Sequence, residues 1–260
     1  MTELTARTYL APGMLRVYRA IVKRVSDELG INIRLRVGAS DYHDVENSDL
    51  HFICGLPYVR RAHHIEAIAA PVLSGERYHD KPIYFSDVIV RYDSPFQTFE
   101  DLRGHSWAYN EPESQSGYGI TCYTLVKRGL IGGFFGRVIE AGYHRQSIKM
   151  VCNGEVDAAA IDSQVLEFEK RQNPEIAAQI RIIDTFGPST IQPICVSRRM
   201  DSDLKRGIQE CLTGIHQIDG LREKLDFGLI ERFITVSDSD YDDIRAMLAA
   251  CENASFLQLK

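Results

Sequence analysis

The sequence predicts an α/β protein built from two lobes. Short apolar runs that read as strands alternate with helical patterns along most of the 260 residues. The composition, 44% hydrophobic and 25% charged, is that of an ordinary globular chain, and the length suffices for two modest domains. We find no internal repeat or low-complexity segment. We therefore expect two three-layer α/β lobes.

The first part of the chain reads as strand, helix, strand. Residues 4–10 form a candidate strand, apolar side chains then recur at helical spacing from Met14 to Val25, and Gly30 ends that helix. Residues 31–37 alternate apolar and polar side chains, as a half-buried strand does. Short apolar runs follow at 49–54 and 67–73, and between them we expect a helix with Arg60 and Arg61. Another strand is expected at 83–90.

A second alternating series follows a short helix at 98–104, in which Thr98 and Asp101 can form a capping box and Gly104 ends the helix. The expected elements are strands at 106–110, 137–141, 157–161 and 181–185, and helices at about 116–128, 145–153 and 163–180. After a break at 187–190 we expect a strand at 194–197 and helices at about 201–217 and 238–250.

Two lobes arise if the chain leaves the first near residue 90 and returns near residue 190. Residues 1–90 and 188–260 would then form lobe 1, and residues 91–187 lobe 2. Two crossover strands would make a hinge, with a ligand cleft between the lobes.

Charge and cysteine usage exclude several classes. A net charge of -6 disfavours general attraction to nucleic acid, and no run approaches the roughly 20 apolar residues of a membrane span. The six cysteines are scattered without a CxxC pair and read as buried free thiols. Since Met1–Arg7 lacks the basic-then-apolar build of a secretory signal, a cytoplasmic location is expected for the chain as it stands, the alternative being a periplasmic one.

The loop Ser114-Gln115-Ser116-Gly117-Tyr118 is the strongest candidate site. A helix that begins near Ser116 exposes unpaired N–H groups and the positive end of its dipole. The two serine hydroxyls add donors, Gly117 permits close backbone approach, and Tyr118 can cover a ligand. An oxyanion suits such a place. A plain serine N-cap is the alternative.

Three further positions follow predicted strands or crossovers. His144 precedes a helix and could donate to a ligand, or be a solvated cap residue. Asp162 ends a strand and could accept from an ammonium or hydroxyl, or cap the next helix. Tyr84 and Asp87 lie at the presumed crossover and could face a cationic group, or be hinge packing.

From the first lobe, Tyr42 and Tyr58 follow strands and would face the second lobe. The pair His63-His64 is a poor metal site, because adjacent helix residues point in different directions and no third ligand is suitably spaced. The glycine-rich run 132–136 lacks both GxGxxG spacing and the Walker lysine. We expect neither a metal nor a cofactor.

Several sequence segments together resemble those of the phosphonate-binding solute receptors of the PhnD type. They are Tyr84-Phe85-Ser86-Asp87-Val88-Ile89-Val90-Arg91, Asp93-Ser94-Pro95, Phe99-Glu100-Asp101-Leu102-Arg103-Gly104, Glu111 to Tyr118, Gly142-Tyr143-His144 with Ser147-Ile148, and Asn153 to Asp162. The resemblance covers about residues 5–215. Ser-x-Ser-Gly-Tyr is its most specific piece, and Gln115 stands where relatives often carry Thr.

The resemblance implies a type II periplasmic-binding-protein fold that closes over a phosphate, phosphonate or similar anion, with an ABC permease or another protein as partner. A binding protein is thus the leading hypothesis. The alternative is a cytosolic enzyme on the same fold, similar to some menaquinone- and thiamine-pathway enzymes, with His144 as acid or base.

Overall fold

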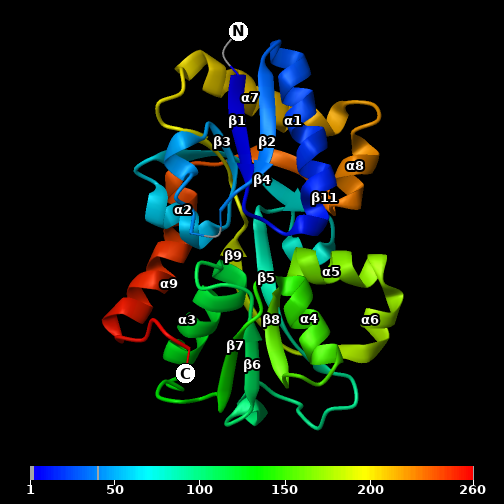
Figure 1. Cartoon of the computed structure of the whole chain (residues 1–260), viewed down its shortest axis with the longest axis vertical. Helices are drawn as coiled ribbons and strands as arrows, with labels where there is room; N and C mark the ends of the chain where they lie inside the picture. The colour runs from blue at the N-terminus through cyan, green and yellow to red at the C-terminus, as the bar shows by residue number, and fades with distance from the viewer. Residues whose placement is uncertain (1–2, 40, 260) are drawn as a thin grey trace. The chain divides into compact units, whose positions relative to one another are not determined.

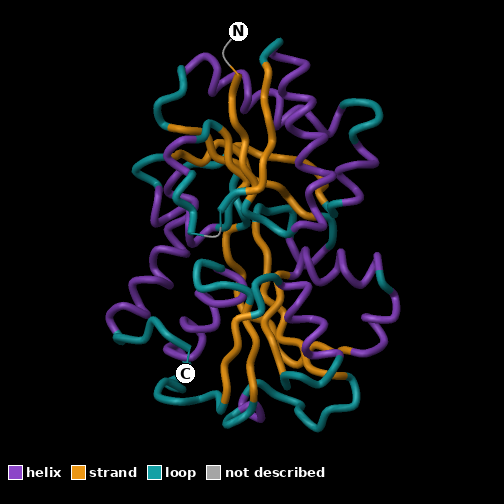
Figure 2. Tube along the Cα trace, in the orientation of Figure 1, coloured by secondary structure: helices purple, strands orange, loops and turns teal. Residues whose placement is uncertain are grey.

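A computed structural model of the chain describes residues 3–39 and 41–259; positions 1, 2, 40 and 260, which the sequence assigns to lobe 1, lie outside the described residues. The chain divides into two compact units. Unit 1 comprises Met1–Ile83 and Thr190–Asp242, and unit 2 comprises Tyr84–Ser189 and Asp243–Lys260. Each unit has its own mixed sheet with helices against it (Figures 1 and 2). The predicted α/β class with two lobes is confirmed.

Unit 1 contains a six-stranded sheet in the order β11-β4-β10-β3-β1-β2. Its strands are β1 (Glu3–Thr8), β2 (Asn32–Val37), β3 (Leu50–Phe52), β4 (Ile65–Leu73), β10 (Ile194–Ser197) and β11 (Ile230–Thr235). Its helices are α1 (Leu15–Leu29), α2 (Gly55–Arg61), α7 (Ser202–Gly214) and α8 (Arg222–Phe227). β1 runs parallel to β2 and β3, whereas β10 and β11 run antiparallel to their neighbours.

Helix α1 shows how the local sequence determines an element. Val17, Ile21 and Val25 recur at helical spacing and are buried. The helix ends at Gly30, whose φ of 62° is in the left-handed region that glycine adopts at little cost. The expected strand–helix–strand opening is therefore present, with helix and strand bounds close to the predicted ones.

Unit 2 contains a five-stranded sheet in the order β7-β6-β8-β5-β9. Its strands are β5 (Ile83–Arg91), β6 (Ser106–Tyr109), β7 (Arg137–Glu140), β8 (Ala158–Asp162) and β9 (Ile180–Thr190). Its helices are α3 (Ile120–Lys127), preceded by a π-helical turn Gln115–Gly119, then α4 (His144–Cys152), α5 (Ser163–Gln172), α6 (Pro174–Gln179) and α9 (Asp242–Asn253).

Alternation along the central strand β8 makes unit 2 a three-layer structure. Ala158 and Ala160 belong to a core with residues of α3 and α9, whereas Ala159 and Ile161 belong to a second core with residues of α4 and α5. Successive strand side chains point to opposite faces, so a central strand with helices on both sides must be apolar throughout. Figure 1 shows α3 and α9 on one side of this sheet and α4, α5 and α6 on the other.

Several elements differ from expectation. The predicted helix 163–180 is two helices, since Pro174 follows Asn173 and proline starts a helix better than it continues one. β9 runs on through Gly187 and Pro188, where the pattern suggested a break. The short helix at 98–104 shrinks to a 3-10 turn, Glu100–Leu102, although the Asp101 carboxylate does accept from the backbone N–H of Thr98 (2.9 Å).

The unit boundaries also differ from the sequence-based ones of 1–90 with 188–260 and 91–187. The chain passes between units at 83/84 and 189/190, and again at 242/243. The third passage was not expected. It arises because Cys251, Phe256 and Leu259 are buried in the same core as residues of α3, which places 243–260 with unit 2. No helix within the described ranges is long and apolar enough to cross a membrane.

Candidate anion-binding site

The candidate site of unit 2 lies where three parallel strands end. β6 pairs in parallel with both β7 and β8, so their carboxyl ends share one edge of the sheet. Ser114 follows β6, His144 begins α4 after β7, and Asp162 ends β8. This is the edge at which open α/β sheets collect their ligands. Helix amino-terminal ends, with their partial positive charge, meet there too.

The loop Ser114–Tyr118 forms the π-helical turn in front of α3. Ser114 is its N-cap, and the Ser114 hydroxyl accepts from the backbone N–H of Gly117 (3.0 Å). The cap that the sequence left as an alternative is therefore present, and it uses the backbone N–H of Gly117, one of the N–H groups at this helix start. The proton of the Ser114 hydroxyl is not consumed by this bond. π-helical turns inside α-helices occur frequently at functional sites.

Position 117 has no room for a side chain, so only glycine fits there. A Cβ built on it would lie 2.0 Å from Asn110 Oδ1 and 3.3 Å from His144 Cε1. Asn110 directly follows β6 and is buried, and its Oδ1 has no hydrogen-bond partner among residues 3–39 and 41–259. Asn110 is not among the site residues predicted from the sequence. A polar residue ending a buried apolar strand at the ligand edge is the signal that could have found it.

Ser116 and His144 form the central contact of the site. Ser116 Oγ lies 2.8 Å from His144 Nε2, and both residues are buried. Burial lowers the pKa of His144 to about 3, so its imidazole is neutral near pH 7. His144 is thus a buried, hydrogen-bonded side chain and not a solvated cap residue.

The surroundings of His144 determine which nitrogen carries its proton. Nδ1 is buried with no hydrogen-bond partner in the described part of the chain. Because an orphaned buried N–H is the rarer and costlier case, we assign the proton to Nε2, which then donates to Ser116 Oγ. The Ser116 hydroxyl then keeps its own proton for an acceptor other than His144, such as the Ser114 hydroxyl at 3.4 Å or a ligand oxygen. Neutral histidine thereby orients a serine as a donor.

Gln115 and Tyr118 contact protein groups within unit 2. The Gln115 side-chain amide is buried and donates to Ser189 Oγ (3.3 Å) and to the sulfur of Met247 (3.2 Å). The Tyr118 hydroxyl donates to the carbonyl of Leu257 (3.0 Å), and its ring packs on Tyr109 at 4.9 Å between centroids. Both therefore connect the loop to the surrounding protein, and their ligand contacts stay predictions.

Asp162, Tyr84 and Asp87 are all buried in unit 2. Asp162 Oδ1 accepts from the backbone N–H groups of Gln164 (2.8 Å) and Val165 (3.1 Å), which is the helix cap that the sequence left open. Asp87 Oδ1 accepts from the Thr185 hydroxyl at 2.8 Å. Ligand contacts by these three side chains stay predictions.

Tyr42 and Tyr58 belong to unit 1. The Tyr58 hydroxyl donates to Asp238 Oδ1 (2.7 Å), and its ring packs edge-on against Tyr241 with centroids 4.8 Å apart. Burial, reinforced by Asp238, raises the pKa of Tyr58 far above its usual value. Tyr42 is buried and stacks on the ring of Tyr9.

Metal ligation has no support in the described residues. Within them, no group of three or more histidine, cysteine or carboxylate side chains could hold an ion. His63 and His64 lie ring to ring at 3.9 Å, and His64 Nε2 pairs with Glu46 Oε1 at 2.9 Å.

The sheet topology and this edge of buried donors define a two-lobed solute-binding protein of the periplasmic-binding-protein class. A family described as "ABC transporter, phosphonate, periplasmic substrate-binding protein" matches residues 8–241. The chain belongs to this family, as the resemblance suggested. The expected cytoplasmic location is corrected by the match, because the family is periplasmic; the first seven residues and the free cysteines were insufficient grounds for it.

A curated relative is consistent with this family assignment. The phosphonates-binding periplasmic protein of Escherichia coli (strain K12) is 29% identical over 107 residues, which cover 39% of this chain and 31% of that protein. The match thus spans about a third of the relative's length.

Two solved structures share the fold. One, a binding protein component of an ABC phosphonate transporter from Pseudomonas aeruginosa, has a TM-score of 0.82 at 18% identity and covers 94% of this chain and 85% of its own. The other, PhnD1 from Prochlorococcus marinus (MIT 9301) in complex with methylphosphonate, has a TM-score of 0.84 at 16% identity and covers 97% and 98%.

Proposed function

We propose that this protein is a solute receptor that binds a phosphate-, phosphonate- or similar oxyanion-bearing ligand at the Ser114–Tyr118 turn and delivers it to an ABC permease. The observation that carries the proposal is the Ser116–His144 hydrogen bond at the start of α3. It turns the proton of the Ser116 hydroxyl away from His144, and the Ser114 hydroxyl, 3.4 Å away, is a distant and weak acceptor for that proton beside a helix start. A ligand oxygen would offer a closer one.

The family's description and the methylphosphonate complex of a structural neighbour support this ligand class. A tetrahedral oxyanion presents several acceptors in different directions, which suits the two serine hydroxyls at the positive end of a helix. Tyr42, Tyr58, Tyr84, Asp87 and Asp162 are proposed as further ligand contacts. Which organic substituent the ligand carries depends on such residues.

Binding without turnover is favoured over an enzyme. A general acid or base near neutral pH needs a pKa close to 7. The pKa of His144 is lowered to about 3 by burial, and its Nε2 is occupied by Ser116. Such a group is suited to orienting a hydroxyl and poorly suited to proton transfer.

The test is titration calorimetry of the purified protein with inorganic phosphate, methylphosphonate, 2-aminoethylphosphonate and sulfate, with mass spectrometry of each mixture after incubation. We expect saturable binding of at least one phosphorus oxyanion, and its recovery unchanged. No binding of any of them would refute the ligand class. A chemically altered ligand would instead favour the enzyme.

A further inference from the structure

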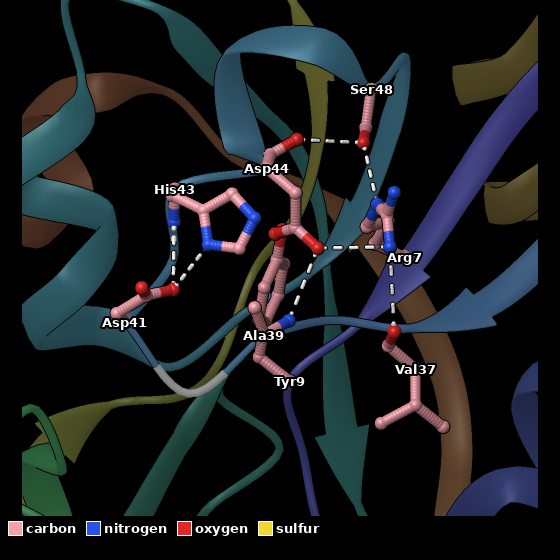
Figure 3. Close-up of polar contacts among 8 residues, drawn as sticks. All are labelled: Arg7, Tyr9, Val37, Ala39, Asp41, His43, Asp44 and Ser48. Carbon is pink, nitrogen blue, oxygen red and sulfur yellow. Dashed lines mark hydrogen bonds and ion pairs between the residues drawn. The ribbon is translucent and has the colours of Figure 1, made fainter.

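A buried polar cluster in unit 1 surrounds the carboxylate of Asp44 (Figure 3). The side chain of Asp44 is only 8% exposed. Oδ1 accepts from the Tyr9 hydroxyl at 2.5 Å, and Oδ2 accepts from the backbone N–H of Ala39 at 3.1 Å and pairs with Arg7 Nη1 at 2.8 Å. A carboxylate removed from water needs such charged and neutral donors to compensate its lost hydration.

The main chain on either side of this carboxylate is fixed as well. Arg7 Nε donates to Ser48 Oγ (2.9 Å), and the Ser48 hydroxyl donates to the Asp44 carbonyl (2.8 Å). Arg7 also donates to the carbonyl of Val37 at the end of β2 (3.4 Å). One arginine therefore joins β1, the end of β2 and the turn after Asp44, as Figure 3 shows. All of these groups belong to unit 1.

Tyr42 lies in the loop between Ala39 and Asp44, two residues that this cluster holds in place. Its ring stacks on Tyr9, with centroids 4.7 Å apart and planes 22° apart, and the Arg61 guanidinium lies 4.7 Å from the same ring. The Tyr9 ring in turn lies over Gly38, where a Cβ would come within 2.0 Å of it. Tyr9 is thus held by Asp44 at its hydroxyl, by Gly38 below and by Tyr42 alongside.

The backbone of Tyr42 is strained. Its φ is 58°, in the left-handed region that bulky residues rarely adopt. Strain of this kind persists only where the surroundings over-determine it, and it concentrates at functional sites. Here the surroundings are the Tyr42 N–H donating to the Ala39 carbonyl (3.0 Å), the Ala39 N–H donating to Asp44, and the stacked rings.

We propose that Asp44 is a positioning residue for ligand binding, which holds Tyr42 in its strained conformation through Tyr9 and Ala39. The inference rests on the proposed function, because Tyr42 is there a proposed ligand contact. Asp44 does not touch the ligand itself. It determines where the Tyr42 side chain lies before the ligand arrives, so that binding need not order this loop.

The chain offers a matched control for Asp44→Asn. Asp41, three positions earlier in the same loop, is exposed, and its carboxylate contacts His43 Nδ1 at 2.5 Å. Asp41→Asn makes the same chemical change one residue from Tyr42, where Asp44 is two residues from it, and does not enter the buried cluster. Figure 3 shows both carboxylates and their separate partners.

The test is a double-mutant cycle with methylphosphonate and inorganic phosphate as probes in calorimetry. Asp44→Asn should weaken binding by about fivefold or more, as coupled neighbours commonly do, whereas Asp41→Asn should leave the affinity unchanged. In a Tyr42→Leu background the effect of Asp44→Asn on affinity should vanish, while its effect on the melting temperature persists. A purely structural role would move the melting temperature alone.

Tyr9→Phe provides a milder variant in case Asp44→Asn does not fold. It removes the hydroxyl that donates to Asp44 and keeps the ring that stacks on Tyr42. We expect weaker binding, again only when Tyr42 is present. Unchanged affinity in both variants, or an equal loss in the Tyr42→Leu background, would overturn the inference. Failure of the wild-type protein to bind any tested oxyanion would instead overturn the proposed function.

Discussion

Replacing Ser116 by alanine tests the central contact of the candidate site. The change removes the hydroxyl that lies 2.8 Å from His144 Nε2 and, in our proposal, donates to the ligand. A hydrogen bond to a charged group contributes about 1.5–3 kcal/mol, so Kd for the best-binding oxyanion should rise about 10- to 150-fold. Leaving Nε2 without a partner should also lower the free energy of unfolding by about 1–3 kcal/mol.

Ser147→Ala is the matched control. Ser147 is fully buried on α4, and its hydroxyl has no hydrogen-bond partner in residues 3–39 or 41–259. Removing it should leave affinity within about twofold and stability unchanged or slightly higher, since no bond is lost. Calorimetry gives Kd, and urea denaturation gives the free energy of unfolding. If Ser116→Ala keeps wild-type affinity, or if Ser147→Ala loses as much, the reasoning on the donor is refuted.

Two further predictions concern glycine packing and acid stability. Gly117→Ala should displace the loop, because the new Cβ would lie 2.0 Å from Asn110 Oδ1; we expect a lower melting temperature and weaker oxyanion binding, and wild-type values for both would contradict the packing argument. Burial lowers the pKa of His51 to about 4 and that of His144 to about 3, from 6.5, so the folded state binds fewer protons than the unfolded state between these values. The contribution of these two neutral histidines to stability is therefore fully present above about pH 6.5 and is lost as the pH drops towards 4. His51→Leu, which removes a fully buried titratable ring, should reduce this loss of stability in pH-dependent urea denaturation. An undiminished loss would mean that other groups cause it.

The sequence predicts regular elements well where one physical signal dominates. The apolar face of α1 and its terminating Gly30 determine that helix, and the continuous apolar run of β8 predicts a strand covered on both sides. β11 was missed because its residues, Ile230–Thr235, mix charged and apolar side chains without clear alternation. Its strand identity comes from pairing with β4, which is a tertiary contact.

The candidate site was less accessible to sequence reasoning alone. The Ser114 cap follows from local spacing, but the Ser116–His144 contact joins residues 28 positions apart and depends on the parallel arrangement of β6 and β7. Only the resemblance to a known family brought both residues into one prediction. Asn110 could have been proposed from its place at the end of a predicted strand, but its packing against Gly117 is a three-dimensional contact that the sequence does not show.

The C-terminal segment has a consequence for biosynthesis. Cys251, Phe256 and Leu259 complete the core of unit 2, yet residues 190–242, which separate them from the rest of that unit, belong to unit 1. Neither unit is thus a continuous stretch of chain. During translation unit 2 cannot finish its core until unit 1 has been fully synthesised, so simple domain-by-domain folding is not open to this topology. A fragment comprising only residues 84–189 would expose an unfinished apolar surface and should aggregate.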